Sequence, residues 1–156
     1  MTTSPGRVVH SDEVEPITWS GEEAGRFLLR SEDTGGQYSF YEVTVPAGQG
    51  SHFHVHEDTD EAFYIVEGEF EIHLGDVVHR APAGTVVYGP RGVVHAFRNT
   101  LDEPGRMLCV TTPGGIERFF EELSTLMKQD PPADWSQMQE LATRHRIVAF
   151  PDQERN

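Results

Sequence analysis

Three histidines and one glutamate are the residues of this sequence whose types and spacing could do chemistry. His54 and His56 alternate in a short segment, and alternate residues of a strand share one face. Glu61 begins the next apolar run after a gap of four residues, long enough for the chain to turn and return antiparallel beside them. His95 lies within residues 93–97 and is the candidate for a fourth ligand. An isolated His-x-His pattern is more often a pair of solvated side chains, so the interpretation as a metal site needs further evidence from the rest of the sequence.

Together these side chains form a donor set of three imidazoles and one carboxylate. Such a set suits one divalent transition-metal ion, namely iron, manganese, nickel, cobalt, copper or zinc, and does not select among them. Four protein ligands on a six-coordinate ion would leave two positions open, which favours a catalytic site over a closed structural one. Glu61 could also accept a proton from an acidic substrate hydroxyl, so we expect it to be the catalytic residue.

Composition limits the classes of partner. The chain has 156 residues, which fits a single domain over residues 1–156, and its 12 basic and 26 acidic residues give a net charge of −14. An acidic surface of this kind repels nucleic acid and anionic membranes. The one cysteine, Cys109, permits no internal disulfide and is expected in the core. The sequence shows neither a signal peptide nor a membrane-spanning apolar run, and we expect a cytoplasmic protein.

Short strands joined by turns are expected to position these residues. Tyr41, Val43 and Val45 alternate with polar neighbours, and the 15 glycines and 10 prolines favour many tight turns. Further strands are expected at residues 63–66, 69–74, 77–79, 93–99 and 107–111, with a short one at 7–10. This pattern predicts an all-β, antiparallel sandwich or barrel, with its core at about residues 27–112.

The pattern changes to a helical one after residues 113–115. Ile116, Phe119, Phe120 and Leu123 recur at helical spacing and predict a helix that ends near residue 127. Asp134 is the expected N-cap of a second, shorter helix. A last strand is expected at residues 147–150, so the barrel carries a C-terminal helical extension at about residues 115–145.

Two segments of the chain resemble the signature motifs of the cupin superfamily. The matching positions are Gly48, His54, His56, Glu61 and Gly68 in the first motif, and Gly84, Pro90, Gly92, His95 and Asn99 in the second. All ten have the family's spacing, and the resemblance covers about residues 35–112. It implies a conical antiparallel jelly-roll barrel with one metal ion inside, held by His54, His56, Glu61 and His95.

The surroundings of the implied metal are expected to be apolar. Phe63, Ile65, Val93 and Phe97 would line the barrel interior, and the helix after the barrel is expected to pack near its mouth. We expect Phe63, Phe97 and Phe119 to contact the substrate. His52 extends the strand face of His54 and His56, and two roles remain open for it: a spare polar residue at the barrel mouth, or a fifth ligand or proton shuttle.

The chain also resembles the single-barrel, quercetin 2,3-dioxygenase-like cupins of bacteria, at residues 33–36, 61–68 and 113–120. This resemblance implies a metal-dependent dioxygenase that acts on an enolic or phenolic small molecule, with dioxygen as co-substrate, and a homodimer is expected. Two alternatives stay open: a non-oxidative isomerase, cyclase or lyase, and a small-molecule-binding protein without catalysis. The second would need an output module, and no DNA-binding segment or second domain is visible.

Overall fold

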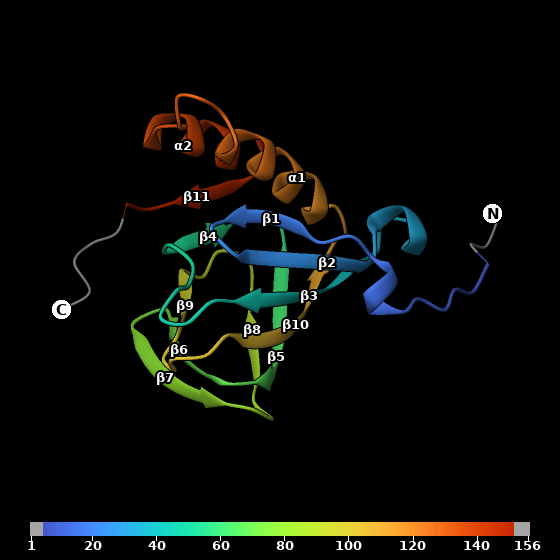
Figure 1. The fold of residues 1–156 in the computed structure, drawn as a ribbon, viewed down its shortest axis with the longest axis horizontal. Helices are drawn as coiled ribbons and strands as arrows, with labels where there is room; N and C mark the ends of the chain where they lie inside the picture. Colours follow the sequence, from blue (N-terminus) through green and yellow to red (C-terminus); the bar gives the residue numbers. More distant parts are fainter. Residues whose placement is uncertain (1–4, 152–156) are drawn as a thin grey trace.

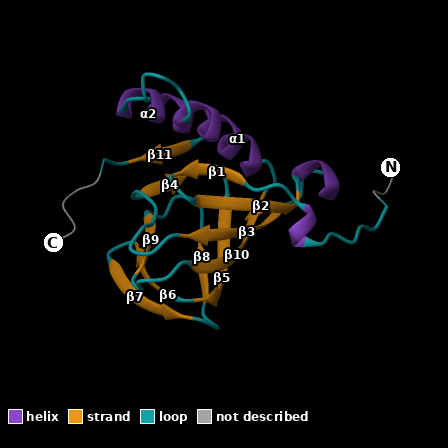
Figure 2. Cartoon of the chain, in the orientation of Figure 1, coloured by secondary structure: helices purple, strands orange, loops and turns teal. Residues whose placement is uncertain are grey.

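A computed structural model describes residues 5–151, which form two facing antiparallel sheets with two helices at one side (Figures 1 and 2). The six-stranded sheet has the order β1 (Ile17–Ser20), β2 (Glu23–Leu29), β3 (Ser39–Val45), β10 (Gly105–Thr112), β5 (Asp60–Glu67) and β8 (Val86–Gly89). The five-stranded sheet has the order β11 (Ile147–Ala149), β4 (His54–His56), β9 (His95–Asn99), β6 (Glu69–Leu74) and β7 (Val77–Pro82). This is the predicted all-β jelly roll. Its two sheets are joined by loops and not by a closed ladder of backbone hydrogen bonds.

The core lies between the two sheets because alternate side chains of each strand point inward. In β3, for example, every second residue from Ser39 to Val45 is buried. The buried cluster consists of Trp19, Phe27, Tyr41, Val43, Val45, Phe63, Ile65, Phe70, Ile72, Ala81, Val87, Met107 and Cys109. Cys109 is therefore a core residue, as expected.

The strand pattern differs from the prediction in several places. Residues 7–10 are not a strand, and the Val8 side chain is 87% exposed, so two adjacent valines do not form a strand where no partner strand lies beside them. β1, β2 and β8 were not among the expected strands. β8 has only four residues, and its two valines, Val86 and Val87, are too short an apolar run to indicate a strand from sequence.

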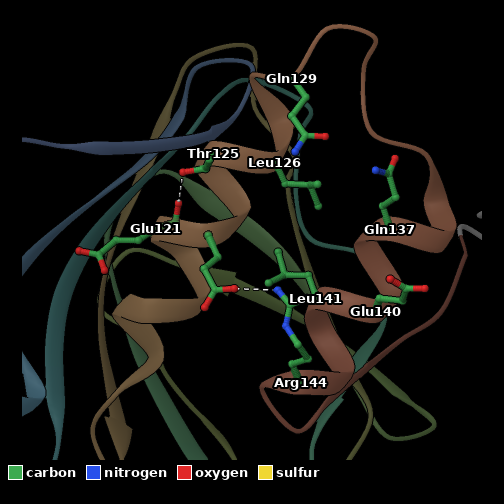
Figure 3. A pocket seen from close by; sticks show the side chains of 9 residues that line it. Glu121, Thr125, Leu126, Gln129, Gln137, Glu140, Leu141 and Arg144 are labelled. Carbon is green, nitrogen blue, oxygen red and sulfur yellow. Dashed lines mark hydrogen bonds and ion pairs between the residues drawn. The ribbon is translucent and has the colours of Figure 1, made fainter.

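The two helices follow the sandwich, with α1 at Ile116–Met127 and α2 at Trp135–Arg144. Asp134 caps α2 as predicted, and its carboxylate accepts a hydrogen bond from the Gln137 backbone N–H at 2.9 Å. α1 lies against β1, and α2 lies against β11. A surface cleft between the helices is lined mostly by polar side chains (Figure 3). Across it, Arg144 of α2 forms an ion pair with Glu122 of α1 at 2.8 Å.

The chain returns to the five-stranded sheet after α2. β11 pairs antiparallel with β4 along its whole length, with Ile147 opposite His56 and Ala149 opposite His54. The helical extension is thus tied to the strand that carries two of the histidines. No helix in residues 5–151 is long and apolar enough to cross a membrane.

Candidate metal centre

Four side chains converge between the two sheets. His54 and His56 lie on β4, His95 lies on β9 directly opposite His54, and Glu61 lies on β5. One ligand atom from each lies within 4.8 Å of the others. His56 and His95 are 6% and 2% exposed, so this cluster is in the interior and not on a solvated face. Three nitrogens and one carboxylate oxygen at this spacing could bind one metal ion.

Glu61 reaches the cluster by a different route from the one expected. It was predicted to return on a strand beside the two histidines, but β5 belongs to the six-stranded sheet, where it pairs with β10 and β8. The histidines therefore come from one sheet and the carboxylate from the other. The prediction of a hairpin was wrong because the chain crosses between sheets after β4, as a jelly roll requires, and does not turn back within one.

The local chain path brings β4 and β9 together. A Cβ atom at Gly50 would lie 1.9 Å from the Phe97 carbonyl oxygen, so only glycine allows this approach of the two backbones. Gly50 forms a bridge with Arg98, and the Ser51 N–H donates to the Phe97 carbonyl at 3.0 Å. This contact sets His54 opposite His95.

The imidazole orientations fit a metal ion. Nδ1 of His54 lies 2.8 Å from the His52 carbonyl oxygen, and Nδ1 of His95 lies 3.0 Å from the Val93 carbonyl oxygen. Each Nδ1 must carry a proton to make these bonds, so in the neutral ring the lone pair of Nε2 is left to bind a metal ion, the arrangement usual in metal-binding histidines, whereas in the metal-free protein Nε2 of a protonated His95 donates to Glu61. Nε2 of His95 lies 3.0 Å from Oε2 of Glu61.

The electrostatics of the cluster favour charged Glu61 and neutral His54. Burial alone would raise the pKa of Glu61, but hydrogen bonds from His56 and His95 outweigh it and hold that pKa well below its usual value. Burial, followed by the neighbouring His95 and His56, lowers the pKa of His54 to about 3. Burial would also lower the pKa of His95, but the bond to Glu61 and its charge raise it above 6.5.

A tyrosine holds the second oxygen of Glu61. The Tyr41 hydroxyl donates to Oε1 of Glu61 at 3.0 Å, and its side chain is 1% exposed. Burial, and then the charge of Glu61, raise the pKa of Tyr41 well above 10, so it stays a neutral donor. From the sequence, Tyr41 was expected only as a strand residue. Its inward position in the alternating pattern of β3 was the available signal, but that pattern does not reveal a partner on β5.

Comparison with known proteins places this fold and cluster in a family. The model of the cupin domain matches residues 41–111. Protein SchB of Streptomyces halstedii is 34% identical over 109 residues, which make up 69% of this chain and 78% of SchB. This chain is a cupin. The ten motif positions predicted from the sequence lie within or beside the matched range.

Two further relatives bear on this cupin. Quercetin 2,3-dioxygenase of Bacillus subtilis is 29% identical over 105 residues, which cover 67% of the cupin but 31% of that longer protein. The structure of the polyketide cyclase RemF from Streptomyces resistomycificus has a TM-score of 0.61 at 24% identity, covering 69% of the cupin and 80% of RemF. At that identity the likeness to RemF shows the shared fold alone.

The cluster opens into an interior cavity of about 300 Å³. His54, His56 and Glu61 line it, together with Phe63, Phe97 and Phe119, the three residues expected to contact substrate. Ile65 and Val93 do not line it. Ile65 is instead fully buried in the core.

The helical extension closes part of this cavity. Phe119 of α1 and Trp135 of α2 are among its lining residues, so side chains of the extension form part of the cavity surface. His52 also lines the cavity, and its ring lies edge-on to Trp135 at 5.1 Å between centroids. The ring of His52 is outside the cluster of four ligand atoms.

Trp19, Glu23 and Trp135 also line the cavity, and the sequence did not indicate a site role for them. Trp19 and Glu23 belong to the first two strands, which precede the motif region. Trp135 was assigned to the apolar face of a helix, and nothing in that spacing indicates a cavity beneath it.

Proposed function

We propose that this cupin is a metal-dependent enzyme that acts on a small molecule with an enolic or phenolic hydroxyl, as a dioxygenase of the quercetin 2,3-dioxygenase type. The observation that carries the proposal is that the cluster of His54, His56, Glu61 and His95 opens into a cavity lined with aromatic side chains. The relative from Bacillus subtilis supports the oxidative reaction.

In this proposal His54, His56, Glu61 and His95 hold one divalent transition-metal ion. The ion, when bound, supplies Lewis acidity that lowers the pKa of a substrate hydroxyl and a site for dioxygen. The chain prepares the site by fixing Nδ1 of His54 and His95 on backbone carbonyls, so little reorganisation is needed on binding.

Glu61 is the proposed proton acceptor. Tyr41 donates to Oε1, so Oε2, the oxygen that faces His95, is the atom that would bind the ion and that would receive the substrate proton on shifting away from it. The low pKa of Glu61 keeps this carboxylate ionised but also makes it a weak base, so the transfer depends on the ion first making the substrate hydroxyl more acidic. The neutral Tyr41 hydroxyl holds the carboxylate in one orientation, and we assign it a positioning role.

The aromatic wall is proposed to bind the substrate ring. Phe63 comes from β5, Phe97 from β9 and Phe119 from α1, so the three contacts come from both sheets and from the extension. Burial of a flat apolar substrate against them would exclude water from the site and strengthen the electrostatic contacts there.

A non-oxidative cyclase or isomerase is the second candidate, and it is supported by Polyketide synthase CurC of Streptomyces cyaneus, which is 32% identical to this cupin over 110 residues. It would use the same ligands and the same base, without dioxygen. The two reactions differ in one measurable quantity, the consumption of oxygen per substrate molecule converted.

The test begins with elemental analysis of the purified protein, where we expect about one transition-metal ion per chain. Quercetin and a panel of enols and phenols are then supplied in an oxygen electrode and in an anaerobic cell. Oxygen uptake that matches substrate loss supports the dioxygenase. Turnover of equal rate without oxygen would replace it with the second candidate, and a His54→Ala variant that keeps full metal occupancy would overturn the ligand assignment.

We also propose that the protein forms a homodimer through the outer face of β5 and β8. Tyr64 and Val86 lie opposite each other in the β5–β8 pair, and Tyr88 follows on the same face. These side chains are 46%, 68% and 56% exposed, which is a sizeable apolar surface for an edge strand. Analytical ultracentrifugation of Tyr88→Lys should show monomers where the natural sequence shows dimers, and a monomeric natural protein would refute the proposal.

A further inference from the structure

Glu23 is a buried carboxylic acid that the proposed reaction does not use. It is the first residue of β2, and its side chain is 5% exposed, on the same inward face as Gly25 and Phe27. It lines the same cavity as the metal-ligand cluster. An acidic residue is rarely this buried without a partner or a function.

The surroundings of Glu23 leave much of its hydrogen-bonding capacity unused. The Trp19 side chain is near enough to donate one hydrogen bond, and none of the ion pairs formed within residues 5–151 includes Glu23. Burial in these surroundings raises the pKa of Glu23 to about 7. A carboxylate has two acceptor oxygens, and a protonated carboxyl group can also donate. Near neutral pH this side chain can therefore pair with either a hydroxyl or a carbonyl group.

Glu23 and the metal-ligand cluster are at two different places on one cavity. Glu61 lies on β5, and Glu23 lies on β2, with β3 and β10 between them in the sheet. The Cys109 thiol of β10 is near both carboxyl groups, because each of them raises its pKa in addition to burial. Val43 and Met107 line the cavity from the same intervening strands. The cavity thus has a carboxyl group at each of two positions, and the strands between them contribute Val43, Met107, Cys109 and Tyr41, whose hydroxyl is already bonded to Glu61.

We propose that Glu23 binds a second polar group of the substrate, a hydroxyl or a carbonyl, at the end remote from the metal ligands. The substrate is then a flat, largely apolar molecule with polar groups at two separated positions. One of them is the enolic or phenolic hydroxyl at Glu61, and the other meets Glu23. This inference rests on the proposed function, since it takes the cavity as the substrate site, and it makes Glu23 a specificity-determining residue.

A matched set of ligands tests the inference. Metal-loaded protein is titrated calorimetrically at pH 8 with naphthol, which has one hydroxyl, and with each dihydroxynaphthalene isomer, which has two at different separations. We expect one isomer to bind about 10-fold tighter than naphthol, the size typical of a hydrogen bond to a charged group. Glu23→Leu should reduce that preference to less than about 2-fold.

Two variants separate recognition from stability. Glu23→Gln keeps an oxygen for Trp19 but cannot ionise, so the preference for the favoured isomer should fall at least threefold even if Glu23→Leu does not fold. Glu42→Gln is the matched control, because Glu42 lies on β3 and pairs with Arg106, outside the cavity lining. It should keep the full preference. Metal content should be unchanged in all three variants.

The outcomes distinguish this inference from the proposed function. Equal binding of naphthol and every isomer by the natural protein, or a preference that survives in Glu23→Gln, would overturn the role of Glu23 and leave the metal-dependent enzyme standing. Failure of the metal-loaded protein to bind any of these phenols would overturn the phenolic substrate class itself, and the Glu23 proposal with it.

Discussion

At the scale of single residues, the geometry of the metal centre is set by the atom of each side chain that already makes a hydrogen bond. His54 and His95 use Nδ1 on backbone carbonyls, and Glu61 uses Oε1 on the Tyr41 hydroxyl. The remaining atoms, two Nε2 and one Oε2, face one another. A metal ion placed among them would meet donors whose directions are set by hydrogen bonds outside the ligand set.

Glu61→Gln tests the proposed general base. The amide can still lie near the metal, but it cannot accept the substrate proton, so we expect substantial metal retention with turnover per bound ion lowered about 10²–10⁴-fold. Activity and metal content are measured on the same samples. Parallel loss of metal and activity would mean that Glu61 only balances charge. Turnover per bound ion equal to that of the natural protein would show that Glu61 is not the general base.

Acid should release the metal through His95. Its pKa is raised above 6.5 in the metal-free protein, so below that pKa the ion must displace one proton, and affinity should fall about tenfold for each pH unit. His54 does not contribute to this loss near neutral pH, because its pKa is about 3. Zinc titrations from pH 8 to pH 5.5 measure the slope. An affinity that is constant over this range would contradict the protonation of His95.

Glu23 should make stability depend on pH in the direction opposite to an ion-paired carboxylate. Its pKa is about 7 when folded and 4.5 when unfolded, so the unfolded chain ionises first and stability falls as pH rises from 4.5 to 7. Glu23→Gln lacks this loss. It should gain stability over the natural protein at pH 8, by at most about 3 kcal/mol, and little at pH 4.5. Urea unfolding at both values measures the difference, and an equal effect at both would show that the pKa is ordinary.

At the scale of elements, α1 joins the sandwich through an aromatic cluster. The Phe120 ring lies 4.2 Å from that of Trp19, 5.9 Å from that of Phe27 and 6.1 Å from that of Tyr41, measured between centroids. At the start of the same helix, the buried Glu117 carboxylate accepts hydrogen bonds from the Ser39 hydroxyl at 2.6 Å and the Ser31 N–H at 2.8 Å. The extension is therefore part of the core and not an appendage.

Phe120→Asp should destabilise the protein by about 3 kcal/mol or more, since it removes aromatic packing and places a charge in an apolar contact. Arg118→Ala, at an exposed position of the same helix, is the control and should change stability by less than about 0.5 kcal/mol. Chemical denaturation followed by circular dichroism measures both. Equal stability of the two variants would mean that α1 does not pack on the barrel in solution.

Some elements and site residues could be predicted from the sequence, and others could not. α1 occupies the predicted range because its apolar residues repeat at helical spacing and two glycines precede it. The ligands were identified because their motif spacing is local within each segment. Tyr41 and Glu23 were not, since their roles depend on β5 and on the cavity, which arise only when distant strands pair. The sheet assignment of β5 was missed for the same reason.

At the scale of the whole molecule, the metal is expected to add stability without being required for folding. The core cluster contains thirteen buried residues, none of them a proposed ligand. Chelation should therefore leave the sheet signal in circular dichroism intact and lower Tm by roughly 5–10 °C at a hundredfold excess of metal over Kd. His95→Ala, without chelator, should give a similar Tm and serves as the control. Loss of the sheet signal at room temperature after chelation would contradict this expectation.

The pairing of β4 with β11 has a consequence for the order of folding. β4 has three residues and meets β9 only at His54, so most of its partnership is with a strand about ninety residues later in the chain. Contacts over such long separations form late, because their loop entropy must first be overcome. The sandwich can thus assemble around Glu61 and His95 while His54 and His56 still move. A refolding chain is therefore expected to gain high metal affinity late, when β11 pairs with β4.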